Sequence, residues 1–508
     1  MILEQRFNKI IFCTISGLLA VSAFPKMNLF FLIWIAFVPL IFVIMRTGVK
    51  NSFFYSFITG LVFNAIGLYW LIHTLQFNMN SYLQAIIAVC ILLFYLALYW
   101  GTWGMSICLA KNIIQKAIGN ELYSTILIIF FGASMWVLLE YIRTYFLTGF
   151  PWMLIGYSQF QFIEIIQISE FTGVYGVSFL VIFCNLCFYF WISISNGKKY
   201  LYIALILNIV IIIFGAFRAD RFRFFGNKEF TVSIVQPNID QYKKWDIIYE
   251  KEVLSKLKKY SHEIAKNKTD LVLWPETVIT KIIPDNAKNI ANIAGGFNLV
   301  GSMYNDENYK LYNVVLAFEK DIIFKKVHKK NHLVPFGEFI PFRGLLSKFF
   351  AILNKFDDLT KGSDTNVFDN GEIYVGSTIC SENFFSDISR RFVLAGAKVL
   401  TNHTNDAWFF NTAAPHQHFM MNIFRAIENR KAVMVSANSG ISGIVEASGV
   451  IIAKTISSKN ILLRGIFFQN DFITFYTKYG DLFVDLCAIF VMIIFVFLYL
   501  FLILTDKK

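Results

Sequence analysis

The sequence predicts a multi-pass membrane protein in which a bundle of eight helices is joined to one water-soluble α/β sandwich domain. Of its 508 residues, 56% are hydrophobic and only 16% are charged, so the chain is too apolar for a wholly soluble protein. It is also too long for a helical bundle alone. A stretch of roughly 260 residues, in which short β-rich runs alternate with amphipathic stretches, accounts for the remainder.

Eight apolar segments meet or approach the roughly 20 residues that a helix needs to cross about 30 Å of hydrocarbon. They are residues 10–24, 29–44, 53–71, 82–109, 122–142, 174–194, 201–217 and 483–504. The first is the shortest and also fits a cleaved signal peptide, but we expect it to be retained. The predicted division is a membrane domain of seven helices at 1–217, a soluble domain at 218–482, and the eighth helix with a tail at 483–508.

Basic residues in the short loops predict the orientation of the chain. Ten of them fall at alternate membrane exits: Arg6, Lys9, Arg46, Lys50, Lys111, Lys116, Lys198, Lys199, Lys507 and Lys508. The opposite exits offer only Lys26 and Arg143. By the positive-inside rule, both termini are expected in the cytoplasm and the soluble domain on the outer side. Because the net charge of +12 gathers at membrane edges, we expect no nucleic-acid partner.

The soluble domain contains a single cysteine. Six of the seven cysteines lie inside apolar runs, where a thiol is most simply a small buried hydrophobe: Cys13, Cys90, Cys108, Cys184, Cys187 and Cys487. Cys380 has no soluble partner for a disulfide and no companion thiols for a zinc site. It is therefore either an inert core thiol or a nucleophile, and composition leaves both open.

Polar residues follow directly after several β-rich runs of the soluble domain. Runs are expected at residues 230–235, 271–273, 299–303, 314–318, 322–327, 373–379, 399–401, 433–435 and 443–446, with amphipathic stretches such as 250–265 and 416–431. Glu276, Lys330, Cys380 and the pair Asn405-Asp406 come after four of these runs. Since ligands bind at the carboxyl ends of strands in open α/β sheets, the pattern points to one site.

The local strings around these residues resemble the apolipoprotein N-acyltransferases, the membrane branch of the nitrilase superfamily. In the soluble domain the strings are WPET at 274–277, KNHLVPFGE at 330–338, ICSE at 379–382, NDAWF at 405–409 and RAIE at 425–428. Others are TGFPW at 148–152, GYSQ at 156–159, QPNI at 236–239 and KW at 244–245. The resemblance covers nearly the whole chain. One position departs from it, since the family commonly has tyrosine where Ser381 follows the cysteine.

The resemblance implies a nitrilase-like αββα sandwich that carries a Glu-Lys-Cys triad. Cys380 would be the nucleophile, and because a thiol with a pKa of ~8.5 is mostly protonated at neutral pH, it would need Glu276 as a general base. Lys330 would stabilise the oxyanion of the tetrahedral intermediate. The supporting carboxylates would be Glu338 and Glu382, which would orient Lys330 and the substrate amine. Trp245 resembles a lid residue, and further candidates near the substrate are Asn405, Asp406 and Trp408.

Each of these residues also has an ordinary structural explanation. A glutamate after Trp-Pro is commonly a solvated turn residue, a lysine among other lysines a charged face, and a lone cysteine part of the core. A loop cap explains Asn405-Asp406, core packing explains Trp408, and Arg425 with Glu428 fits a surface ion pair. The combination of these residues within matching strings favours catalysis for the triad.

The implied reaction moves an acyl chain from a membrane phospholipid to Cys380, and then to the N-terminal amine of a diacylglyceryl apolipoprotein. It needs no nucleotide, and we expect no cofactor and no metal. The bacterial inner membrane, with a periplasmic catalytic domain, is the implied location. Residues 345–353 fit either an arm dipping into the membrane interface or a core helix. Two alternatives are a membrane-tethered nitrilase-type amidase and a transporter or receptor with an outer sensor domain.

Overall fold

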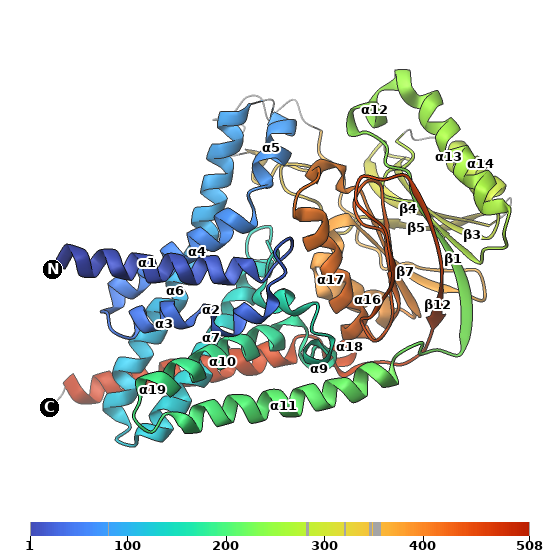
Figure 1. The fold of residues 1–508 in the computed structure, drawn as a ribbon. Coiled ribbons are helices and arrows are strands. Elements are labelled where there is room, and N and C mark those ends of the chain that lie inside the picture. Colours follow the sequence, from blue (N-terminus) through green and yellow to red (C-terminus); the bar gives the residue numbers. More distant parts are fainter. Residues whose placement is uncertain are drawn as a thin grey trace. The chain divides into compact units, whose positions relative to one another are not determined.

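The computed structural model describes residues 2–79, 81–280, 284–319, 322–344, 348 and 357–506. Most of the arm expected at 345–353 lies outside these residues. The chain divides into two compact units (Figure 1). We call Met1–Arg218 together with Tyr479–Lys508 the helical unit, and Ala219–Lys478 the sandwich unit.

The helical unit is built from helices that follow the predicted apolar segments. They are α1 (Ile2–Ser22), η1 (Phe30–Leu32), α2 (Ile33–Ala36), α3 (Val38–Ile44), α4 (Val49–Gly67), α5 (Leu71–Met79), α6 (Tyr82–Ala117), α7 (Glu121–Tyr145), η2 (Ile155–Gln159), α8 (Ile163–Ile166), α9 (Ser169–Thr172), α10 (Val174–Ser193), α11 (Lys198–Arg221) and α19 (Leu482–Asp506). Five helices of the described chain, α6, α7, α10, α11 and α19, are long and apolar enough to cross a membrane. The count of eight spanning helices therefore remains a prediction.

The second predicted segment is divided rather than continuous. Its apolar residues form a short stretch at Phe30–Ile44, broken between α2 and α3 at Phe37. Pro39 occupies the first turn of α3, where its missing N–H cannot continue the hydrogen bonds of the preceding helix. Hydropathy alone did not reveal this break.

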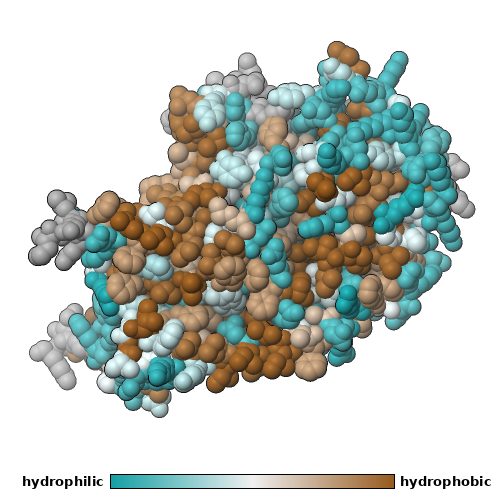
Figure 2. Space-filling view, viewed as in Figure 1, coloured by the Kyte–Doolittle hydropathy of each residue, from teal (hydrophilic) through white to brown (hydrophobic). Residues whose placement is uncertain are grey.

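The helical unit presents apolar side chains to its surroundings and buries several polar ones. Figure 2 shows hydrophobic residues dominating the surface over the long helices of this unit, as a lipid-facing surface requires. Inside, Glu140 and Arg143 of α7 are each only 4% exposed. Ile155 N donates to Glu140 Oε1 (2.7 Å), and Arg143 Nη2 donates to the carbonyl of Trp152 (3.3 Å). The two charged residues thus hold the loop that follows α7.

The sandwich unit contains two six-stranded sheets. The first has the order β12-β1-β2-β3-β4-β5, and the second β11-β10-β9-β8-β7-β6. The strands are β1 (Lys228–Gln236), β2 (Leu271–Leu273), β3 (Phe297–Asn305), β4 (Leu311–Glu319), β5 (Ile322–Lys329), β6 (Val367–Asp369), β7 (Tyr374–Ile379), β8 (Val399–Thr404), β9 (Val433–Ala437), β10 (Gly443–Val445), β11 (Ile451–Lys454) and β12 (Ile461–Gln469). The central strands β1, β2 and β3 are parallel to one another, as are β7, β8 and β9.

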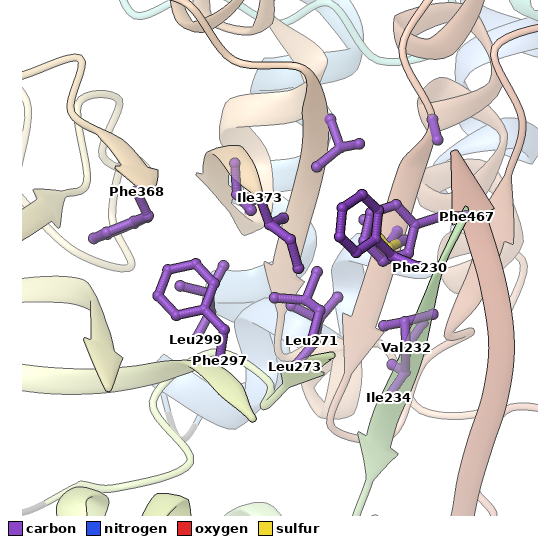
Figure 3. Packing of buried hydrophobic residues seen from close by; sticks show 14 of the residues in the cluster. Phe230, Val232, Ile234, Leu271, Leu273, Phe297, Leu299, Phe368, Ile373 and Phe467 are labelled. Atoms are coloured by element: carbon purple, nitrogen blue, oxygen red, sulfur yellow. The ribbon is translucent and has the colours of Figure 1, made fainter. Parts of the chain in front are cut away.

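The main core of this unit lies between the two sheets. Inward-facing residues of the first sheet, such as Phe230, Leu273 and Phe297, are seen in Figure 3. They belong to one buried cluster with Val375 and Met434 of the second sheet. All of these are buried, and full burial of a large apolar side chain contributes about 1.5–3 kcal/mol. Strand alternation sends the neighbouring residues to the outer faces, where helices cover them.

Amphipathic helices complete the four layers. Helices α13 (Glu250–Ala265) and α14 (Pro284–Ala294) contribute Leu257, Ile264 and Ile290 to a second core on the first sheet. Helices α16 (Ser386–Leu394) and α17 (Ala414–Asn429) contact strands of the second sheet. The predicted class, an apolar helical bundle with an αββα sandwich, is confirmed.

Candidate active site

Cys380 lies where β7 ends and the short helix η5 (Cys380–Phe384) begins. The preceding residue, Ile379, is fully buried between the sheets, so the end of the strand is fixed. Cys380 has a φ of 51°, a conformation that is uncommon for residues other than glycine. Its carbonyl accepts from Asn402 Nδ2 (3.1 Å) and from His418 Nε2 (3.3 Å). These contacts hold the half-buried thiol at a sharp turn beyond the strand.

Glu382 ties this turn to the end of β5. Its Oε2 accepts from Ile379 N (2.7 Å) and lies 2.9 Å from His328 Nε2, while its Oε1 accepts from Asn331 N (2.5 Å). Burial works to raise the pKa of the Glu382 carboxyl. The charge of His328 and the two backbone N–H groups outweigh that effect, so the pKa lies below its usual range. The fully buried carboxylate therefore joins the segments that carry Cys380 and Lys330.

Lys330 follows β5 and brings two carboxylates together. Its Nζ lies 2.8 Å from Glu338 Oε1 and 3.3 Å from Glu276 Oε1. Asn313 Nδ2 donates to the same two oxygens, at 2.7 Å for Glu276 and 3.3 Å for Glu338. Glu338 Oε2 accepts from Val334 N (2.7 Å), which fixes the second carboxylate. Two carboxylates thus converge on one ammonium group, and Asn313 binds both of them.

The charges of these groups fix the protonation states of the lysine and the thiol. Burial works to lower the pKa of Lys330, but Glu338, Glu276 and Cys380 raise it well above its usual range. Burial raises the pKa of Cys380, and Glu276 and Asp406 add to the increase, while Lys330 and a hydrogen bond with Thr404 oppose it. At neutral pH the site therefore holds an ammonium group and a protonated thiol. Such a thiol attacks a carbonyl only after a base has removed its proton.

Among the remaining predicted residues, Asn405 is joined by a hydrogen bond to the short helix that carries Trp245. Asn405 Nδ2 donates to Gln241 Oε1, and its Oδ1 accepts from Asn438, each at 2.9 Å. Its side chain makes no cap bond to the helix η6 (Asp406–Phe409) that it precedes, so a loop cap does not explain it. Trp408 is only partly buried. Trp245 ends the short helix α12 (Gln241–Trp245), and its side chain is 51% exposed.

Asp406 belongs to a buried network beside the cysteine. Its Oδ1 accepts from Thr404 Oγ1 (2.8 Å) and faces His418 Nδ1 (2.8 Å). Because His418 also reaches the Cys380 carbonyl, Asp406 acts on the turn through the histidine. Gly440 is needed here, since a Cβ at that position would lie 2.1 Å from Asp406 Oδ2.

Sequence reasoning missed several residues of the site. Asn313 is a buried polar residue in the middle of β4, and the only signal for it is an amide within an apolar strand. Lys244 belongs to a matching string, but nothing in that string indicates that the lysine is buried. Arg425 and Glu428 are fully buried rather than a surface pair, and Arg425 Nη1 donates to the Asn383 carbonyl (3.1 Å) at the end of η5.

Replacement of Glu382 by glutamine tests whether its carboxylate stabilises the joined segments that carry Cys380 and Lys330. The amide introduces an N–H where the carboxylate accepts from backbone donors, so we expect a loss of about 2 kcal/mol at neutral pH. A carboxyl with a lowered pKa stabilises the fold above its unfolded pKa of about 4.3 and loses that effect as pH falls through the folded value. The Tm difference between wild type and Glu382→Gln in detergent should therefore shrink in acid. Exposed Glu372 gives the control, Glu372→Gln, and a difference independent of pH would contradict the role of the charge.

Comparison with known proteins finds a matching family for each unit of the chain. Residues 16–187 match the family described as apolipoprotein N-acyltransferase N-terminal domain, and residues 231–464 match the carbon-nitrogen hydrolase family. An apolipoprotein N-acyltransferase of Geobacter metallireducens is 32% identical over 494 residues, covering 93% of this chain and 92% of that protein. One from Rickettsia prowazekii is 31% identical over 444 residues, covering 80% of this chain and 84% of the relative.

Among solved structures, Nit3 of Saccharomyces cerevisiae, a member of branch 10 of the nitrilase superfamily, covers 48% of this chain and 91% of its own, at 18% identity and a TM-score of 0.38. The similarity to the Geobacter metallireducens relative extends through both the helical and the sandwich unit. The chain belongs to the apolipoprotein N-acyltransferase family.

Proposed function

We propose that this protein transfers an acyl chain from a membrane phospholipid, through a thioester on Cys380, to the N-terminal amine of the diacylglyceryl-cysteine of apolipoproteins. The family and the apolar helices support a membrane enzyme that acts on lipid and lipoprotein. The observation that carries the proposal is the Lys330 ammonium, held by Glu276 and Glu338 and electrostatically coupled to the Cys380 thiol.

In the first step, Glu276 accepts the proton of the Cys380 thiol, and the sulfur attacks the ester carbonyl of the phospholipid. The negative charge that develops on the carbonyl oxygen is stabilised by Lys330, whose raised pKa keeps it charged at neutral pH. Collapse of the tetrahedral intermediate breaks the ester C–O bond. Glu276 returns the proton to the departing alkoxide, so that lysophospholipid leaves and the acyl chain remains on the sulfur.

In the second step, the α-amino group of the apolipoprotein attacks the thioester carbonyl. Glu276 accepts a proton from the amine, Lys330 again faces the oxyanion, and the thiol leaves with a proton. Glu338 keeps the lysine in place in both steps because it lies closer to Nζ than Glu276 does. A thioester preserves the reactivity of the donor ester, so this ping-pong scheme requires no nucleotide.

The rival function is a membrane-tethered nitrilase-type amidase with the same triad. Exposed apolar side chains near the site favour a lipid substrate. On α12 and the turn η3 (Ile247–Tyr249) that follows it, these are Tyr242 (70% exposed), Trp245 (51%), Ile247 (69%) and Ile248 (79%). Enzymes that hydrolyse small soluble amides have no need for such a surface, whereas an enzyme that receives acyl chains does.

The positions of the basic loops support a bacterial inner-membrane location with both termini in the cytoplasm. Residues 218–482 would then form a periplasmic catalytic domain between the membrane segments 1–217 and 483–508. Both substrates are insoluble in water, so they would reach this domain by lateral diffusion in the outer leaflet of that membrane.

Intact mass spectrometry after incubation with phospholipid tests the thioester. We expect wild type to gain the mass of one acyl group, labile to hydroxylamine, with lysophospholipid released. Cys380→Ala should show no adduct, and Cys380→Ser should be crippled, because a hydroxyl is a weaker nucleophile. Cys90 is exposed on α6, so Cys90→Ala is the control and should acylate normally. Full acyl transfer by Cys380→Ser would overturn the assignment, and amide hydrolysis without lysophospholipid would favour the amidase.

Replacement of Lys330 by methionine tests oxyanion stabilisation. The change removes the positive charge and leaves Glu276 and Glu338 facing one another, so thioester formation should slow by about 10²–10³-fold. Lys326→Met is the control, because Lys326 is half exposed and pairs with Asp369 at the surface. Single-turnover acylation measures both rates. A Lys330→Met enzyme that acylates at the wild-type rate would contradict the proposed role.

Cysteine labelling tests the orientation. Tyr309, 89% exposed in the sandwich unit, and exposed Lys50, in the first turn of α4 on the predicted cytoplasmic side, are replaced singly by cysteine. In intact spheroplasts a membrane-impermeant maleimide should label Tyr309→Cys, and it should label Lys50→Cys only after permeabilisation. The reverse pattern would place the catalytic domain in the cytoplasm.

A further inference from the structure

Two adjacent lysines of α12 have opposite environments. The side chain of Lys243 is 44% exposed and pairs with Glu252 at the surface. Lys244 is only 4% exposed. Lysine is almost never fully buried unless it is paired, because burial of an ammonium group is costly. The burial of Lys244 therefore calls for a functional explanation.

The Lys244 ammonium binds the segment that carries Glu276. Its Nζ donates to the Glu276 carbonyl (3.0 Å) and to Thr277 Oγ1 (2.7 Å). Among the described residues, no carboxylate lies within ion-pair distance of it. Thr277 has a φ of 44°, so the backbone that accepts these hydrogen bonds is itself in an uncommon conformation. Lys244 thus fastens α12 to a strained turn at the catalytic carboxylate.

Helix α12 is held in place by hydrogen bonds rather than by close apolar packing. At its start, Gln241 accepts from Asn405, and after Lys244 the chain is held by Thr280 Oγ1, which donates to the Lys244 carbonyl (3.3 Å). Beside the turn lies a cavity of about 130 Å³, lined in part by Lys244, Trp245, Val278 and Ile279. Since apolar packing is incomplete there, the position of α12 depends largely on the hydrogen bonds of Lys244.

The charge of Lys244 also acts on the reacting groups. Burial lowers the pKa of Lys244 to about 7, and the negative charge of Glu276 opposes that decrease. Electrostatic attraction acts in both directions, so the ammonium also stabilises the Cys380 thiolate when it forms. The other charged groups around it are Asp246 and Glu250, which line the same cavity, and Lys243, which is neutralised by Glu252.

We propose that Lys244 is a positioning residue of the site: its ammonium fastens the turn that carries Trp245 to the backbone of Glu276 and adds a second positive charge beside Cys380. This inference rests on the proposed thioester chemistry. It makes the placement of Trp245 and of the base depend on the same protonated side chain. As pH rises through the pKa of Lys244, the ammonium loses its charge, and both effects weaken together.

The pH dependence of thioester formation tests the proposal. The full-length enzyme is mixed with phosphatidylethanolamine in detergent micelles, and single-turnover acylation is followed by intact mass. At about pH 6, where Lys244 is charged, wild type should be about 10-fold faster than Lys244→Met. At about pH 9, where Lys244 is neutral, the ratio should approach one. Lys243→Met is the matched control, with a ratio near one at both pH values.

A permanently charged side chain gives the converse result. Arginine does not lose its proton in this range, so Lys244→Arg should not share the decline in rate that wild type shows above neutral pH. If the Tm of Lys244→Met in detergent shows that this variant does not fold, the comparison of Lys244→Arg with wild type still tests the proposal. A wild-type to Lys244→Met ratio that is the same at both pH values, or an unchanged alkaline decline in Lys244→Arg, would overturn the role of Lys244 alone. A wild type that forms no thioester would overturn the proposed function and this inference with it.

Discussion

The ammonium of Lys330, shared between Glu276 and Glu338, is the interaction on which the site depends. Two carboxylates this close would repel one another in a buried setting, and the lysine with Asn313 holds them together. The surroundings of Cys380 also set the protonation state of its thiol. Burial raises the pKa of Cys380 and the charge of Glu276 adds to the increase, so the cysteine is a thiol at rest. In the proposed mechanism the nucleophile therefore forms only when Glu276 takes its proton, and Lys330 then stabilises the charge on the substrate oxygen.

The αββα fold supplies this arrangement because the active residues follow strand ends. Glu276 comes after β2, Lys330 after β5 and Cys380 after β7, so the site lies at the ends of strands from both sheets. Close approach of backbones is required as well. A Cβ at Gly301 of β3 would lie 2.2 Å from the Pro275 carbonyl, and only glycine lets the segment before Glu276 pack there. Glu382 then locks the ends of β5 and β7 together through three hydrogen bonds from buried groups.

Much of this could be predicted from sequence, for reasons that particular residues make clear. Glu276, Lys330 and Cys380 stand out because each is a reactive residue directly after an apolar strand. Asn313 could not be found in that way, since it lies inside β4 and its role exists only where β4 meets Glu276 and Glu338. Adjacent lysines in a polar loop look alike, yet consecutive positions on a helix point about 100° apart, so Lys243 is exposed and Lys244 is buried. The break at Phe37 escaped prediction because hydropathy does not register the lost hydrogen bond at Pro39.

In the proposed mechanism the triad by itself does not decide between transfer and hydrolysis, because water and an amine would attack the same thioester carbonyl. The choice depends on which of them reaches the half-buried sulfur first. An acyl chain bound over the site would exclude water, and the exposed apolar residues of α12 and η3 are suited to contact such a chain. That turn is anchored to the site at Asn405 and at the Glu276 carbonyl. Protection of the thioester and placement of its base are consequently properties of one short segment, and a change that loosens α12 would favour hydrolysis at the expense of transfer.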